Sequence, residues 1–116
     1  MTDVAGMLRS FHYAALGTLV SERVGGAIRP EDVARLTPWA DLWYRTVAAA
    51  YLRGYREGAA DASFMPNSDD ELTLLLSTSM LHKVMYELSY ELNNRPDWVA
   101  VPLRGLLDLL GPADQA

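Results

Sequence analysis

The sequence of 116 residues contains no cysteine, so it can form neither a disulfide nor a metal site with thiolate ligands. It also has no run of Lys or Arg, and its formal net charge is −5. Because nucleic-acid phosphates are bound by basic patches, these features disfavour a nucleic-acid partner. No apolar segment reaches the roughly 18 residues of a membrane span, and the N-terminal segment lacks the pattern of a secretory signal. We therefore expect a cytoplasmic protein without a membrane partner.

Motifs that bind nucleotides or metals are also missing from the sequence. It contains no G-x-G-x-x-G or G-x4-G-K-S/T phosphate loop and no G-x-S-x-G nucleophile elbow. The two histidines, His12 and His82, are isolated and have no His or Glu at the spacing of a metal-binding helix. We interpret them as surface residues or satisfied core residues, and we expect this chain to hold no metal and no cofactor.

Helical periodicity runs through the whole sequence, and no strand pattern interrupts it. Half of the residues are hydrophobic and 22% are charged, as in an ordinary globular protein, and the length suits one domain over residues 1–116. The expected fold class is all-α, a helical bundle of three longer helices and a short C-terminal one. The predicted helices run from Thr2 or Asp3 to about Arg23, from Thr37-Pro38 to about Ala62, from Asp69 to about Asn93, and from Pro102 to Leu110.

The helix boundaries rest on local signals. Gly25-Gly26 supplies a helix stop, and Thr37-Pro38 supplies an N-cap followed by a proline at the first helical position. Ser68 and Glu71 form a capping box at the start of the third helix. Two apolar stripes are expected to face the core. They are Trp39, Trp43, Val47, Ala50 and Gly54 in the second helix, and Leu81, Met85, Leu88 and Leu92 in the third.

One face of the third helix combines aromatic rings with both signs of charge. Its residues recur at i, i+3, i+4 and i+7, which places them on one side of a helix. Rings offer an apolar platform and charged groups offer directional hydrogen bonds, a combination that suits a small polyhydroxylated ligand. The same spacing also fits a half-buried helix with an internal Lys-to-Glu ion pair. The face consists of Lys83, Tyr86, Glu87 and Tyr90.

Five blocks of the sequence resemble the actinobacterial maltokinases and the kinase-like region often fused to trehalose synthase. The first is D-V-A-G-M-L-R-S-F-H-Y-A-A from Asp3 to Ala15, and the last is K-V-M-Y-E-L-S-Y-E-L-N-N-R-P-D-W-V-x-V-P-L-R-G-L from Lys83 to Leu106. Between them lie W-A-D-L-W with A-x2-L-R-G-Y, and F-M-P at residues 64–66. The resemblance covers nearly the whole chain.

The resemblance implies the C-terminal helical lobe of a fold similar to aminoglycoside phosphotransferases and protein kinases. Such proteins transfer the γ-phosphoryl group of ATP to the anomeric hydroxyl of maltose, so ATP and Mg²⁺ are implied for the complete fold. Phosphoryl transfer also needs a nucleotide cradle and metal-binding groups. The family's H-G-D-L-H and I-D-F-E-G-E segments are absent from this sequence. We therefore expect no kinase activity from this chain alone.

The resemblance also assigns roles to residues of the last block. Lys83, Tyr86 and Tyr90 match positions that line the maltose pocket of the family, and Glu87 is a fourth candidate. Glu91, Asn94 and Arg95 belong to the same motif and are expected to hold the loop that follows. His82 departs from the acidic residue that the family usually carries before the lysine, which leaves the preferred sugar open.

Three hypotheses about function follow. The first is a lobe that binds a small sugar such as maltose. The second is a module that forms a homodimer or recruits a partner subunit, because loss of a nucleotide lobe would expose apolar surface. The third is a nucleotide-independent enzyme, with acid and base groups drawn from one set of residues. That set is Tyr86, Tyr90, Glu87 and His12.

Overall fold

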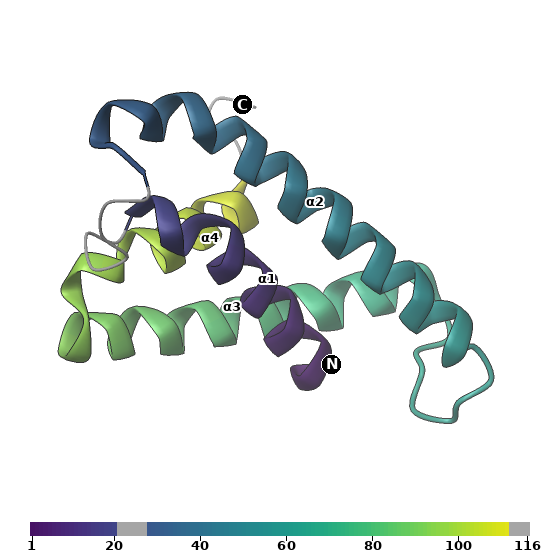
Figure 1. Cartoon of the computed structure of the whole chain (residues 1–116). Helices are drawn as coiled ribbons and strands as arrows, with labels where there is room; N and C mark the ends of the chain where they lie inside the picture. Colours follow the sequence, from purple (N-terminus) through teal and green to yellow (C-terminus); the bar gives the residue numbers. More distant parts are fainter. Residues whose placement is uncertain (21–27, 112–116) are drawn as a thin grey trace.

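The structure is a computed structural model that describes residues 1–20 and 28–111. Within these ranges the regular secondary structure is entirely helical, so the predicted all-α class with three longer helices and one short helix is confirmed (Figure 1). None of the described helices is long and apolar enough to cross a membrane. The helices are α1 (Thr2–Val20), α2 (Val33–Gly58), α3 (Asp69–Asn94) and α4 (Ala100–Leu110), with short 3-10 turns η2 (Pro30–Asp32) and η3 (Pro96–Trp98).

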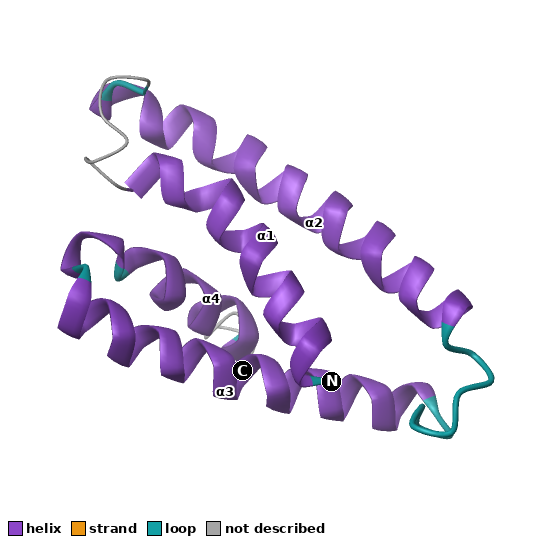
Figure 2. Ribbon diagram, turned by 60° about the horizontal axis from the view of Figure 1, so that its bottom comes forward, coloured by secondary structure: helices purple, strands orange, loops and turns teal. Residues whose placement is uncertain are grey.

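Helix α1 is the centre of the arrangement. It packs against α2 on one side and against α3 and α4 on the other, and Figure 2 shows it running between them. Helices α3 and α4 also pack against each other, joined by η3. Since every other helix contacts α1, the side chains of α1 decide what the interior contains.

The apolar core gathers around the N-terminal half of α1. Val4, Ala5 and Leu8 are buried there against Ala48 of α2 and Met80 of α3. Half-buried rings extend this core, among them Phe11 and Tyr51, whose ring centroids lie 5.6 Å apart in an edge-to-face arrangement. Burial of this apolar surface is the main force that holds α2 and α3 on α1.

Several predicted boundaries are close to those observed. The Ser68 half of the capping box is confirmed, since the backbone N–H of Glu71 donates to Ser68 Oγ at 3.1 Å and α3 begins at Asp69. The Glu71 carboxylate accepts from the backbone N–H of Asn67 at 3.2 Å, one residue before the predicted partner. Helix α4 begins two residues before the predicted Pro102 and ends where Gly111 takes a φ of 73°. The predicted end of the first helix, at Arg23 and Gly25-Gly26, lies outside the described residues.

The predicted start of α2 at Thr37-Pro38 is wrong. The helix begins at Val33, because the 3-10 turn that starts at Pro30 leads directly into it. Pro38 therefore lies inside the helix, where its missing N–H removes one backbone hydrogen bond. At the other end α2 stops at Gly58, before the predicted Ala62.

Both predicted core stripes are wrong in orientation. Trp39 and Trp43 are 67% and 46% exposed, while Ala48 and the half-buried Tyr44 and Tyr51 face α1. In α3 the predicted inward side chains Leu81, Met85 and Leu92 are exposed, and Leu88 is half-buried. The buried residues of α3 are instead Met80, Val84, Glu87 and Glu91. Two carboxylates turn inward because α1 presents hydrogen-bond donors to them.

Candidate functional site

Arg9 places a positive charge in the interior next to the apolar core. Ala5, Arg9, His12 and Leu16 recur at helical spacing on the buried side of α1, so Arg9 is only 3% exposed. A buried charge is costly unless it is paired. Glu87 of α3 supplies the pairing: Arg9 Nε donates to Glu87 Oε1 at 2.6 Å and to Oε2 at 3.2 Å. Burial raises the pKa of Glu87, and the Arg9 charge acts in the opposite direction.

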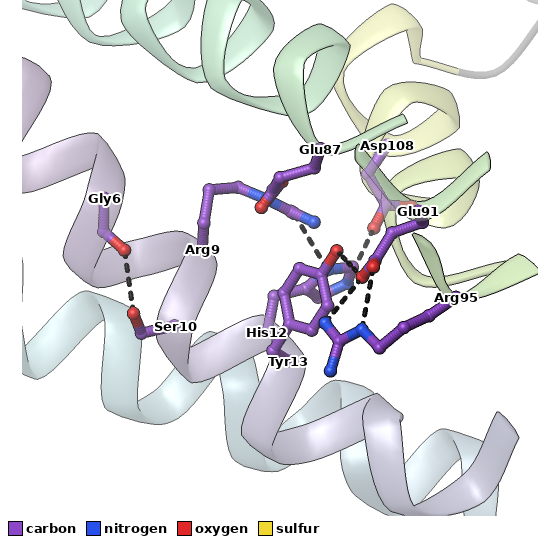
Figure 3. A network of polar contacts seen from close by, with 9 residues as sticks. All are labelled: Gly6, Arg9, Ser10, His12, Tyr13, Glu87, Glu91, Arg95 and Asp108. Atoms are coloured by element: carbon purple, nitrogen blue, oxygen red, sulfur yellow. Dashed lines mark hydrogen bonds and ion pairs between the residues drawn. The ribbon is translucent and has the colours of Figure 1, made fainter. Parts of the chain in front are cut away.

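His12 extends this network toward α4 (Figure 3). Arg9 Nη1 lies 2.8 Å from His12 Nδ1, and a guanidinium can only donate, so Nδ1 is the acceptor. The proton of the neutral ring is therefore on Nε2, which lies 3.9 Å from Asp108 Oδ2. Burial, followed by the charges of Arg9 and Arg104, lowers the pKa of His12 from 6.5 to about 3.

Glu91 forms a second buried centre one turn further along α3. The Tyr13 hydroxyl donates to Glu91 Oε2 at 2.7 Å, and Arg95 donates to both carboxylate oxygens at 2.9 Å (Figure 3). Burial and the hydrogen bond to Glu91 raise the pKa of Tyr13. Arg95 also lies over the Trp98 ring, 4.5 Å from its centroid, and this ring stacks on Tyr13. Glu91 and Arg95 thus hold η3, as expected for the following loop, whereas the Asn94 amide donates to the Tyr90 carbonyl of α3 itself.

The four residues of the predicted sugar face do not lie on one surface: Tyr86 and Tyr90 are exposed, and Glu87 is buried. Tyr86 and Tyr90 are 62% and 46% exposed, one helical turn apart. Lys83 Nζ lies 5.6 Å from the centroid of Tyr86, and the Arg95 guanidinium lies 5.8 Å from that of Tyr90. Glu87 is buried, and its ion-pair partner is Arg9 of another helix. We call the half-buried Lys83 together with the exposed Tyr86 and Tyr90 the tyrosine face.

The four acid and base candidates of the third hypothesis do not converge. His12 and Glu87 both contact Arg9 in the interior, whereas Tyr86 and Tyr90 face solvent. In the part of the chain that the structure describes, no group of three or more His, Cys, Asp or Glu side chains is placed to hold a metal ion. The described residues therefore combine an exposed aromatic face with a separate buried polar network.

Sequence reasoning missed Arg9 and Tyr13, which anchor the two buried carboxylates. The signal was present, because Ala5, Arg9 and Leu16 share the helical spacing of a buried stripe. A polar residue in such a position indicates a buried partner on a neighbouring helix.

No family model matches this chain.

Proposed function

We propose that this chain is the acceptor-side helical lobe of a kinase-like phosphotransferase, and that the tyrosine face forms the wall on which a small sugar such as maltose lies. The observation that carries the proposal is the pair of exposed rings one turn apart, each with a cation at its face. Sugar rings present C–H groups to aromatic faces, and their hydroxyls accept hydrogen bonds from Lys and Arg.

The buried network supports this proposal by fixing the orientation of α3. Glu87 and Glu91 alternate with the exposed tyrosines along the helix, and each carboxylate is bound by a donor from α1. Rotation of α3 about its axis would break both contacts, so the rings are held outward. Glu87 is therefore a positioning residue for the tyrosine face, and its carboxylate is engaged by Arg9 instead of being free for a ligand.

The test is a titration of the chain with maltose, followed by ¹H–¹⁵N NMR. Saturable shifts are expected in Lys83, Tyr86 and Tyr90, and Tyr90→Ala should weaken binding by about fivefold, which corresponds to about 1 kcal/mol. Phe64→Ala is the control, because Phe64 is an even more exposed ring, in the loop between α2 and α3 and outside the tyrosine face. Shifts that do not saturate, or that Tyr90→Ala leaves unchanged, would contradict the proposal.

This function requires further components for catalysis. Orientation of an acceptor hydroxyl can contribute several kcal/mol to a barrier, but only when a nucleotide and a base are present. Incubation of the chain alone with ATP, Mg²⁺ and maltose should yield no maltose 1-phosphate. Its formation would show that the missing motifs are not needed.

A second candidate function, a self-associating helical module, is favoured by the apolar surface of α2 and α4. Trp39, Leu42 and Trp43 are exposed along α2, as are Leu103, Leu107 and Leu110 along α4. A groove of about 270 Å³ lies between α1, α2 and α4, and Leu103 and Leu107 form part of its wall. Contiguous apolar surface of this kind marks interaction sites in soluble proteins.

A further inference from the structure

Helix α3 carries a second exposed surface, on the side away from the tyrosine face. Leucine, methionine and threonine side chains recur along it at alternating spacings of four and three residues. This is the heptad spacing with which one helix packs against another in a coiled coil. Figure 2 shows α3 along the lower edge of the molecule, with α1 and α4 above it. We call this surface the α3 seam, and it consists of Leu74, Thr78, Leu81, Met85, Leu88 and Leu92.

The fold leaves most of the α3 seam uncovered. Leu74 and Leu92, near its two ends, are 67% and 62% exposed, and Met85 in the middle is 51% exposed. At about 100° per residue, the centre of the seam lies roughly 120° around the helix from the buried side and roughly 150° from the tyrosine face. One helix can therefore hold the core, the tyrosine face and a partner at the same time.

The α3 seam can be covered without leaving polar groups unsatisfied. The charged side chains beside it in the sequence, Lys83, Glu87 and Glu91, lie toward the tyrosine face or in the interior. The Thr78 hydroxyl donates to the carbonyl oxygen of Leu74 at 2.8 Å, so it already has a partner within α3. Since a buried polar group is costly mainly when it lacks a hydrogen bond, a partner helix can cover Thr78 as well.

The charges at the N-terminal end of the seam indicate which kind of partner fits. Glu71 continues the heptad spacing one position before Leu74, and Asp70 lies beside it; both carboxylates are on exposed residues. A covering helix meets these two negative charges, so Lys or Arg is favoured in the layer that faces Glu71. Basic residues are also favoured in the last turn of a helix, which places the partner helix antiparallel to α3.

A second copy of this chain does not supply such a free cation. In an antiparallel pair of α3 helices that matches Leu81 with Met85, Glu71 faces Arg95, whose guanidinium is already bound to Glu91. The exposed area also allows a partner besides a second copy. The chain exposes 7790 Å², about 1,500 Å² more than a compact protein of 12.9 kDa, whereas a standard interface takes roughly 800 Å² from each partner.

We propose that the α3 seam binds an amphipathic helix of another protein chain. The bound helix runs antiparallel to α3, with leucine-type side chains at heptad positions and Lys or Arg in its last turn. The seam spans about 27 Å, so the helix needs about 19 residues. Burial of apolar side chains supplies the affinity, and Glu71 sets the direction. Tyr86 and Tyr90 lie outside the contact, so the inference does not depend on the sugar wall.

The experiment is a titration of the whole chain into a fluorescently labelled helical peptide, followed by fluorescence anisotropy. The peptide has about three heptads with leucine at the a and d positions, alanine and glutamine elsewhere, and lysines in its last turn. It is used at nanomolar concentration, which limits pairing of the peptide with itself. Saturable binding is expected, and a matched peptide with glutamates in place of the lysines should bind about fivefold more weakly.

Variants of the chain locate the bound peptide. Met85→Glu places a charge in the middle of the seam at an exposed position, so helix content should stay unchanged while peptide binding weakens about tenfold or more. Leu92→Glu repeats this test at the exposed C-terminal end of the seam. Phe64→Glu, at an exposed ring in the loop between α2 and α3, is the control and should bind the peptide as the wild type does.

Three results would overturn the proposal. One is a peptide affinity that Met85→Glu and Leu92→Glu both leave unchanged, which would place the peptide on another surface. Another is equal affinity for the lysine and glutamate peptides, which would show that Asp70 and Glu71 do not select the partner. The last is a self-associated wild type that Met85→Glu converts to a monomer, which would assign the seam to a second copy of the chain.

Discussion

At the scale of single residues, Arg9 determines what the interior of this protein can contain. Its guanidinium donates to Glu87 of α3 and to His12 of its own helix, so two buried contacts depend on one side chain. A buried ion pair of this kind adds little net stability compared with apolar packing, but it is strongly destabilising when one partner is removed. The contacts of Arg9 therefore define the register of α3 and α4 on α1.

Glu87→Gln tests how strongly the fold depends on the buried ion pair between Arg9 and Glu87. The substitution keeps the shape of the side chain and leaves the Arg9 charge without its counter-ion, so the free energy of unfolding should fall by about 3 kcal/mol. Urea denaturation measures this change, and Glu57→Gln on the exposed side of α2 should change stability by less than about 0.5 kcal/mol. An unchanged unfolding midpoint together with weakened sugar binding would instead show that Glu87 contacts the ligand directly.

His12 makes a second residue-scale prediction, on the pH dependence of stability. The ring faces Arg9 of its own helix, Tyr44 of α2, and Arg104 and Asp108 of α4, and its pKa is about 3 against 6.5 in an unfolded chain. Between these values the unfolded state binds more protons, so stability falls as the pH falls below about 6.5. The slope approaches 1.4 kcal/mol per pH unit.

Thermal or urea unfolding at pH 7 and pH 5 measures this slope, since most carboxylates remain ionised in that window. His12→Gln should remove most of the dependence, whereas the exposed His82→Gln should keep it. Equal slopes for the wild type and His12→Gln would show that His12 is not the group responsible.

At the scale of elements, helix positions follow from the sequence more reliably than helix faces do. The start of α3 was predictable because Ser68 Oγ accepts from the backbone N–H of Glu71, a local contact that does not depend on the rest of the fold. The face that α3 buries was not, because Glu87 and Glu91 turn inward only where Arg9 and Tyr13 of α1 meet them. The predicted site keeps three accessible residues, Lys83, Tyr86 and Tyr90. Glu87 is buried because Arg9, far away in the sequence, binds its carboxylate.

Helix α4 offers a matched pair of glycine substitutions. Gly→Ala in a helix interior normally stabilises by about 0.5–1 kcal/mol. At Gly105 a Cβ would lie 2.5 Å from Arg9 Nη1, and the guanidinium cannot retreat without breaking its bonds to Glu87 and His12. Gly105→Ala should therefore destabilise by about 1–3 kcal/mol.

Gly54→Ala in α2 is the control, since a Cβ there meets nothing within 4 Å. This variant should show the usual stabilisation by alanine. Both values come from the shift in urea midpoint at constant slope. Stabilisation by Gly105→Ala would mean that Arg9 has another favourable position, and the rigid network described above would then be wrong.

At the scale of the whole molecule, the chain exposes more surface than a closed domain of its mass. Its accessible area is 7790 Å², against about 6,300 Å² for a compact protein of 12.9 kDa. The radius of gyration is 15.6 Å, where about 13 Å is typical for this length. The excess of about 1,500 Å² is larger than the roughly 800 Å² that each partner buries in a standard interface.

This surplus leads to a prediction about oligomeric state that is independent of the sugar wall. Size-exclusion chromatography with light scattering should show a dimer, in which Trp39, Leu42 and Trp43 of two copies cover one another around a two-fold axis. Trp43→Lys should yield a monomer with unchanged helix content, because it places like charges at the centre of that contact. Phe64→Lys, at a more exposed ring outside α2, should remain a dimer. If the wild type is a monomer at high micromolar concentration, the protein does not self-associate and the second candidate function is wrong. Trp39, Leu42 and Trp43 would then be left for a different partner chain.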